Sequence, residues 1–156
     1  MEQLIETQDW NMVSEVELIY RSKIKASQRP KVSRSREAYE LLLKHWDKDK
    51  IELMEQFKVV FLNRCHRVMG IYDLSTGGIT GTVADPRLIF TAALKINACE
   101  LILAHNHPSG NLRPSRADEE LTQKIKTAAR YLDILMMDHL IVSEEGYYSF
   151  ADGGLL

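Results

Sequence analysis

Two histidines one residue apart, His105 and His107, most constrain how this chain can fold and what it can do. They follow the apolar run 101–104, which is typical of a buried strand, and they precede Pro108 in a segment rich in turn-forming residues. In an extended chain, residues i and i+2 project to the same side, so both imidazoles should face one place. Loops at strand ends are where α/β folds place their chemistry.

A carboxylate can reach the same place. Ser115 and Asp118 begin the clearest helical pattern, which we expect to run to Leu132. An acid three residues after a serine also matches a capping box, so Asp118 has two interpretations, a helix cap and a metal ligand. We favour the ligand, because the loop after His107 is short enough to return Asp118 to the histidines; both interpretations can also hold together. Two imidazoles and one carboxylate would leave a tetrahedral zinc ion with an open fourth position, as a catalytic zinc site requires.

A fourth polar group, Glu55, stands at the head of a strand expected over residues 54–63. Glu55 has the same parity as Phe57, Val59 and Phe61, so it leads the side of the strand that should turn to the core. A carboxylate in this position has two interpretations. It lies at the solvent-exposed rim of the sheet, or it faces the metal and acts as a general base toward water.

The elements expected along the chain mix strands and helices without strict alternation, which favours an α/β fold with a mixed sheet between helices. We expect residues 1–24 to form an N-terminal arm and first strand, and residues 25–156 to form one domain. A helix over 85–98 should bury Ile89, Phe90, Ala93, Leu94 and Ile96. Strands are predicted over 15–26, 54–63, 66–74, 82–83, 100–104, 135–142 and 147–150, and the other helices over 35–46 and 115–132.

Charge gives no sign of a dedicated nucleic-acid binder. The 156 residues contain 20 Lys and Arg against 22 Asp and Glu, a net charge of −2, so the chain has no global basic field. The one basic segment is 21–36. A solvated strand face and loop explain it adequately, and contact with nucleic acid is the less favoured alternative.

The sequence also predicts a cytoplasmic protein that does not enter membranes. Residues 1–6 are mixed and acidic, unlike a secretory signal, and no apolar run approaches the roughly 18 residues that a membrane span needs. Cys65 and Cys99 are too few for a disulfide framework and lack a Cys-x-x-Cys spacing. We expect both to be buried thiols in a reducing compartment.

These motifs together resemble a known family. His105-x-His107-Pro108 and Ser115-x-x-Asp118, with an upstream glutamate on a strand, resemble the JAMM (JAB/MPN+) zinc metalloprotease motif. More narrowly, residues 104–110, 114–115 and 138–142 are similar to the RadC family. The resemblance covers about residues 25–156. The helical N-terminal domain of many full-length RadC proteins has no counterpart in the sequence, so we expect a stand-alone JAB domain.

The resemblance implies a cytidine-deaminase-like fold, a three-layer α/β/α sandwich with a mixed sheet. It implies that His105, His107 and Asp118 hold Zn²⁺, and that Glu55 is the general base for a zinc-activated water. It also implies that Ser115 stabilises the oxyanion, a role that competes with helix capping for one hydroxyl. All motif positions are present, unlike in the inactive MPN− type. The implied activity is hydrolysis of a peptide or isopeptide bond in a peptide or protein substrate.

Three alternatives belong to other classes. A DNA-repair or DNA-binding role is the historical label of the RadC family, but the neutral charge and the lack of a helix-hairpin-helix segment weaken it. A zinc deaminase should carry His-x-Glu and Pro-Cys-x-x-Cys, which the sequence lacks. A third possibility is a non-catalytic scaffold stabilised by zinc.

Asp138 and His139 could orient a metal ligand or make ordinary strand-end hydrogen bonds, and we leave them out of the predicted site.

Overall fold

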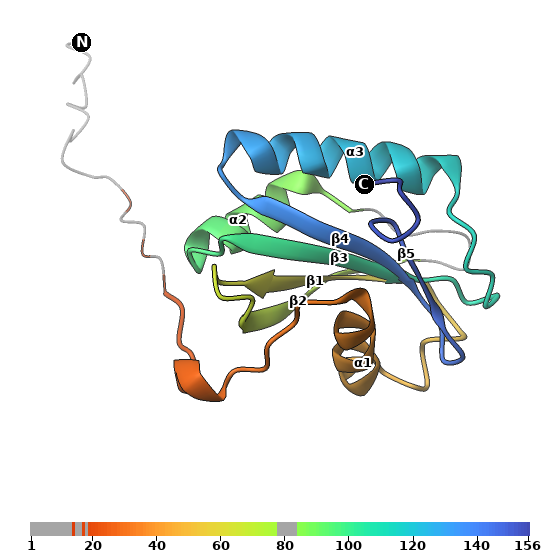
Figure 1. Cartoon of the computed structure of the whole chain (residues 1–156), viewed down its shortest axis with the longest axis horizontal. Coiled ribbons are helices and arrows are strands. Elements are labelled where there is room, and N and C mark those ends of the chain that lie inside the picture. The colour runs from red at the N-terminus through yellow and green to blue at the C-terminus, as the bar shows by residue number, and fades with distance from the viewer. Residues whose placement is uncertain (1–13, 15–16, 18, 78–83) are drawn as a thin grey trace, which may run out of the picture.

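A mixed β-sheet forms the centre of the fold (Figure 1), seen in a computed structural model that describes residues 14, 17, 19–77 and 84–156. The strand order is β2-β1-β3-β4-β5. The pair β3–β4 is parallel, and the other three pairs are antiparallel. The strands of the described part are β1 (Gln56–Leu62), β2 (Val68–Thr76), β3 (Glu100–Asn106), β4 (Leu135–Val142) and β5 (Tyr147–Ser149).

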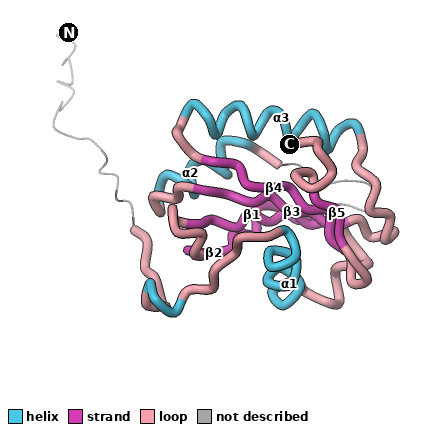
Figure 2. The backbone as a smooth tube through the Cα atoms, viewed as in Figure 1, coloured by secondary structure: helices cyan, strands magenta, loops and turns pink. Residues whose placement is uncertain are grey.

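Helices cover both faces of this sheet. α2 (Pro86–Lys95) and α3 (Arg116–Tyr131) lie over one face, and α1 (Ser35–His45) lies over the other, as Figures 1 and 2 show. A short 3₁₀ helix, Ala26–Gln28, precedes α1. The predicted three-layer α/β/α arrangement with a mixed sheet is therefore confirmed.

Each face of the sheet has its own hydrophobic core. Phe57, Val59 and Phe61 of β1 point to the core under α2 and α3, as the alternation predicted, while Val60 and Leu62 point to the core under α1. All seven residues of β1 and all seven of β3 are buried. The two central strands are thus covered on both sides.

The predicted helix over 85–98 is correct at its start and too long at its end. The Asp85 side chain caps α2 by accepting a hydrogen bond from the Arg87 backbone (2.9 Å), and Pro86 takes the first helical position. The helix ends at Lys95, and Asn97 has a left-handed backbone (φ 54°). Leu94, which we expected to be buried, is 51% exposed because it lies on the outer side of the last turn.

The strand predicted over 100–104 is longer than expected. β3 continues to Asn106, because its pairing with β1 reaches Phe57↔His105 and its pairing with β4 reaches Asn106↔Val142. His105 therefore belongs to a central strand and has rigid neighbours on both sides. Only His107 lies in the loop.

Four other expectations concern the strands at 15–26 and 82–83, the cysteines and the domain boundary. The prediction of a strand over 15–26 is wrong for the described residues 19–26, which have no strand pairing. Residues 15, 16 and 18 lie outside the described residues. The strand expected at 82–83 also lies outside them. Both cysteines are free, but neither is buried as expected: Cys65 is exposed because it lies in the β1–β2 turn, and Cys99 is half-buried. The boundary between residues 1–24 and 25–156 stays a prediction.

No helix in the described part of the chain combines the length and the apolar character that crossing a membrane requires. The cytoplasmic location stays a prediction.

The central strand gives a direct test of this packing. Leu103→Ala removes a fully buried side chain from β3 and should lower the free energy of unfolding by about 2–5 kcal/mol, because a cavity remains. Leu94→Ala, at a half-exposed position, should change it by no more than about 0.5 kcal/mol. Urea unfolding followed by circular dichroism measures both. Equal losses in the two variants would contradict the assigned burial.

Candidate metal centre

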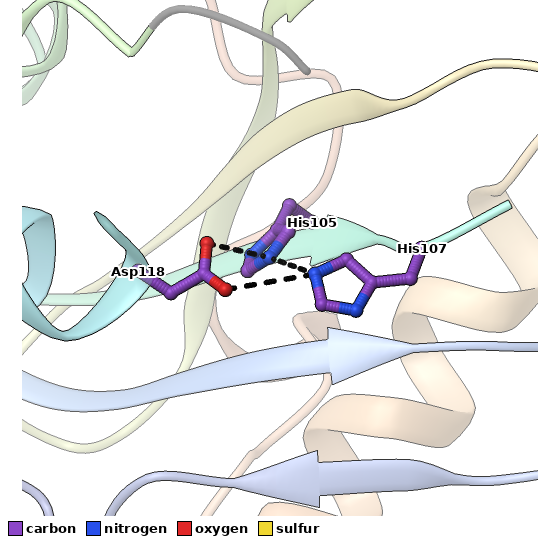
Figure 3. A group of neighbouring side chains, drawn as sticks. All are labelled: His105, His107 and Asp118. Atoms are coloured by element: carbon purple, nitrogen blue, oxygen red, sulfur yellow. Dashed lines mark hydrogen bonds and ion pairs between the residues drawn. The ribbon is translucent and has the colours of Figure 1, made fainter. Parts of the chain in front are cut away.

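Three side chains meet where β3 ends and α3 begins (Figure 3). The His105 Nε2 lies 3.0 Å from the His107 Nε2 and 3.2 Å from Oδ1 of Asp118. The His107 Nε2 lies 3.6 Å from Oδ2 of Asp118. The structure thus brings together the three residues that the sequence predicted as metal ligands.

The spacing of these atoms suits a tetrahedral metal ion. Nitrogen and oxygen ligands lie about 2.0–2.2 Å from zinc, so two of them at tetrahedral angles are about 3.3–3.5 Å apart. The contacts of 3.0, 3.2 and 3.6 Å between His105, His107 and Asp118 bracket that value. Two imidazoles and one carboxylate are also a donor set that zinc prefers. The group can hold a metal ion with only small adjustments of the side chains.

The start of α3 holds the carboxylate in place. The backbone N–H and the hydroxyl of Ser115 both donate to Oδ2 of Asp118 (2.7 Å each), and the Asp118 N–H donates to the Ser115 hydroxyl oxygen (3.1 Å). This is a capping box in which the acid is also the metal-binding candidate. The cap interpretation of Asp118 is therefore confirmed and is compatible with the ligand interpretation, because the capping box orients the carboxylate toward the histidines.

The loop after β3 fixes His107. Its Nδ1 lies 2.5 Å from the backbone carbonyl oxygen of Asn111. A carbonyl only accepts, so Nδ1 carries the hydrogen and Nε2 is the nitrogen that faces Asp118. Gly110 closes the loop with a left-handed backbone (φ 76°) and donates its N–H to the His107 carbonyl.

Charge and burial act strongly on this cluster. Burial alone would raise the pKa of Asp118, but its interactions with His105, His107 and Ser115 outweigh burial and hold that pKa well below its usual range. The same hydrogen bond to Asp118 raises the pKa of His107, with burial opposing the shift and the charge of Glu55 adding to it. Without a metal, the ionised carboxylate of Asp118 therefore favours the protonated form of His107.

Glu55 lies beside the cluster and outside it. It comes directly before β1, which starts at Gln56, and its side chain is half-buried. Its backbone carbonyl accepts a hydrogen bond from Gly77 (2.8 Å). The effect of its charge on the pKa of His107 places Glu55 within electrostatic reach of the metal ligands. The role of Glu55 as a general base stays a prediction.

Asn106, between the two histidines, has a role that the sequence analysis missed. Its fully buried amide accepts from the Gln56 N–H (2.7 Å) and donates to the carbonyls of Ile51 (2.6 Å) and Met54 (2.9 Å). One side chain therefore ties the segment that carries Glu55 to the end of β3. The signal was available in the strand alternation, because an amide at this position points away from both histidines into the sheet's other core.

His139, which the sequence analysis left out of the predicted site, contacts one of the candidate ligands. Its Nε2 lies 2.8 Å from Nδ1 of His105, and its Nδ1 lies 2.6 Å from the Thr122 hydroxyl. Complete burial lowers the pKa of His139 well below its usual value. Asp138 points to the opposite face of β4, where its carboxylate accepts hydrogen bonds from Ser149 and Ala151, and it also accepts from the backbone N–H of His139.

Comparison with known proteins agrees with this geometry. A family model described as the RadC-like JAB domain matches residues 32–155, which include the whole candidate site. The chain belongs to this family. The resemblance seen in the motifs is therefore confirmed, and the matched range begins a few residues before α1.

Curated relatives of this RadC-like JAB domain carry names without a stated activity. A UPF0758 protein of Flavobacterium johnsoniae is 52% identical over 101 residues, which are 65% of this chain and 44% of the relative. UPF0758 proteins of Leptothrix cholodnii and Porphyromonas gingivalis are 49% and 47% identical over 102 and 103 residues, again 65% of this chain and 46% and 45% of theirs. The matched region thus spans less than half the length of these relatives.

The charge of the cluster predicts how metal binding depends on pH. Between about pH 8 and pH 6, zinc affinity should fall, because the raised pKa of His107 puts a proton on a ligand nitrogen that the metal must displace. Competition with a chromophoric chelator at several pH values measures this. Asp118→Asn removes the carboxylate that raises the pKa of His107. This variant should bind zinc more weakly, and its affinity should begin to fall only at a lower pH. A pH-independent affinity in the unmodified protein would contradict the assignment.

Proposed function

We propose that this domain is a zinc-dependent hydrolase that cleaves peptide or isopeptide bonds. The observation that carries the proposal is the convergence of two imidazole nitrogens and one carboxylate within metal-ligand distance of one another. His107 and Asp118 keep 18% and 14% of their side-chain surface exposed, so the cluster is open to solvent on one side. Three protein ligands with one accessible side are the arrangement of catalytic rather than structural zinc.

The surroundings also offer room for a substrate. A cavity of about 290 Å³ adjoins His107 and is lined by Pro108, Ser109 and Gly110 of the loop after β3 and by the 143–145 turn. Loop residues around a rigid strand end are a common setting for substrate binding. Membership of the RadC-like JAB family supports the same reaction class through the JAMM motif.

In the proposed reaction, His105, His107 and Asp118 hold the metal. A zinc ion bound there supplies a lowered pKa for water and a positive charge that polarises a carbonyl oxygen. Glu55 takes a proton from water and returns it to the leaving amine, which is the work of a general base followed by a general acid. Asn106 keeps Glu55 beside the metal ligands through its hydrogen bonds to Gln56 and Met54.

Replacing the general base should separate catalysis from metal binding. Glu55→Gln should retain one zinc per chain and lower kcat/KM by about 10²–10⁴-fold, because the amide cannot accept the proton. Asp118→Ala should lose both zinc and activity. The measurements are metal analysis of purified protein and turnover of a fluorescence-quenched peptide library and of lysine isopeptide substrates.

Three results of this experiment would contradict the proposal. Zinc-loaded protein without turnover of either substrate class would favour a non-catalytic scaffold. Metal-dependent nicking of DNA, with salt-sensitive binding, would favour the DNA-repair alternative. Full activity in Glu55→Gln would remove Glu55 from the mechanism.

Ser115 has two roles in the proposal, and one variant separates them. Its hydroxyl donates to Asp118, so stabilising an oxyanion would require this hydrogen to leave the carboxylate during the reaction. If that occurs, Ser115→Ala should lower kcat by about 10²–10³-fold at saturating zinc. If the hydroxyl only orients Asp118, zinc affinity and stability should fall, by about 1 kcal/mol for the lost cap, with kcat retained in the loaded enzyme. Steady-state kinetics and zinc titration distinguish the two.

A further inference from the structure

A line of hydrogen-bonding groups runs behind His105, on the side away from His107. His105 Nδ1 lies 2.8 Å from His139 Nε2, and His139 Nδ1 lies 2.6 Å from the Thr122 hydroxyl. The Thr122 hydroxyl in turn donates to the backbone carbonyl of Asp118 (2.6 Å). His105 is 1% exposed, and His139 and Thr122 are completely buried, so protein groups alone decide where the hydrogens in this line lie.

The carbonyl at the end of the line sets the direction of every hydrogen bond in it. Because a carbonyl oxygen only accepts, the single hydrogen of the Thr122 hydroxyl must point at Asp118. The hydroxyl oxygen then accepts from His139 Nδ1, which must carry a hydrogen. In a neutral imidazole the other nitrogen has none, so His139 Nε2 accepts from His105 Nδ1. The hydrogen of His105 is thereby placed on Nδ1.

The surroundings keep His139 neutral and its ring fixed. Phe150 stacks on it at 4.6 Å between ring centroids, and Phe57 lies at 5.7 Å. Within the described part of the chain, its ring nitrogens bond only His105 and Thr122, neither of which is a carboxylate. A buried imidazolium without an acidic partner is strongly disfavoured, so the neutral ring is the stable form.

The consequence appears on the other side of His105. With the hydrogen on Nδ1, the lone pair of Nε2 faces His107 and Asp118, at 3.0 and 3.2 Å. Only a nitrogen with a free lone pair can bind a metal, and a hydrogen bond at the opposite nitrogen also makes it more basic. Asp118 contributes twice, because its side chain faces the metal position while its backbone carbonyl anchors the line.

We propose that Thr122 and His139 are positioning residues that hold His105 in the tautomer whose Nε2 is available to the metal. The inference rests on the metal site of the proposed function. A role in packing alone explains these buried polar groups less well. Apolar side chains would fill the same space without three buried polar groups that must all find hydrogen-bond partners.

The first test needs no variant and no metal. Long-range ¹H–¹⁵N correlation spectra of the metal-free protein assign the hydrogen of each neutral imidazole to Nδ1 or Nε2. We expect Nδ1–H for both His105 and His139. A hydrogen on Nε2 of either ring would overturn the proposal, whether or not the protein later proves to bind zinc or to hydrolyse a substrate.

The second test removes the hydroxyl. Thr122→Val should lose the fixed tautomer of His139 and weaken zinc binding by about 10–100-fold, whereas Thr122→Ser should restore both. Ser149→Ala is a matched control, because it removes a buried hydroxyl that bonds Asp138 on the other face of β4. It should leave the histidine spectra and the zinc affinity unchanged.

The outcomes are separable from a failure of the proposed function. Zinc affinity that is equal in Thr122→Val and the unmodified protein, or lowered equally by Ser149→Ala, would overturn the positioning role. A domain that binds zinc as expected but hydrolyses nothing would contradict the proposed function and leave this inference standing. If Thr122→Val does not fold, the spectra of the unmodified protein and of Thr122→Ser still decide the question.

Discussion

The carboxylate of Asp118 is where the two halves of the site meet. It accepts two hydrogen bonds from Ser115 at the start of α3 and faces the histidines at the end of β3. Its position depends on how α3 packs, because Ile125 and Ala129 bury the same helix in the core above the sheet. The packing of a helix thus determines whether three ligand atoms converge, and a shift of α3 along the sheet would separate them.

The polar groups of the site need the apolar core around them. Phe57 stacks on His105 with ring planes only 3° apart, and Phe150 stacks on His139. These rings hold the imidazoles in one orientation and exclude water from the hydrogen bonds behind them. On the opposite face of the sheet, Asn106 makes three hydrogen bonds to the segment that carries Glu55. Ligand orientation and the position of the proposed base therefore have separate supports, one on each side of β3.

Local patterns in the sequence predicted much of this arrangement. The alternation in β1, the cap of α2 by Asp85 and the capping box at Ser115 all depend on neighbours a few residues apart, and the structure has each of them. The pairing of His105 and His107 with Asp118 was predictable for the same reason, since a short loop joins them. The predicted end of the helix over 85–98 was wrong, because the spacing of apolar residues does not indicate the left-handed turn at Asn97.

Contacts between distant residues could not be predicted in this way. His139 reaches His105 across 34 residues, and Asn106 reaches Ile51 across 55. Both contacts depend on strand order and register, and the bulge between Leu101 and Ile102 shifts the pairing of β3 with β4 by one residue. Without that shift, His139 would occupy the other face of the sheet. Composition and periodicity do not encode such a shift.

The most direct test of the central claim is a crystal structure of the zinc-loaded protein with anomalous scattering measured on both sides of the zinc absorption edge. A single strong anomalous peak should lie about 2.0–2.2 Å from Nε2 of His105, Nε2 of His107 and one carboxylate oxygen of Asp118, with a solvent molecule as the fourth ligand. A zinc ion bound at other residues, or a peak ligated through Nδ1 of His105, would contradict the account.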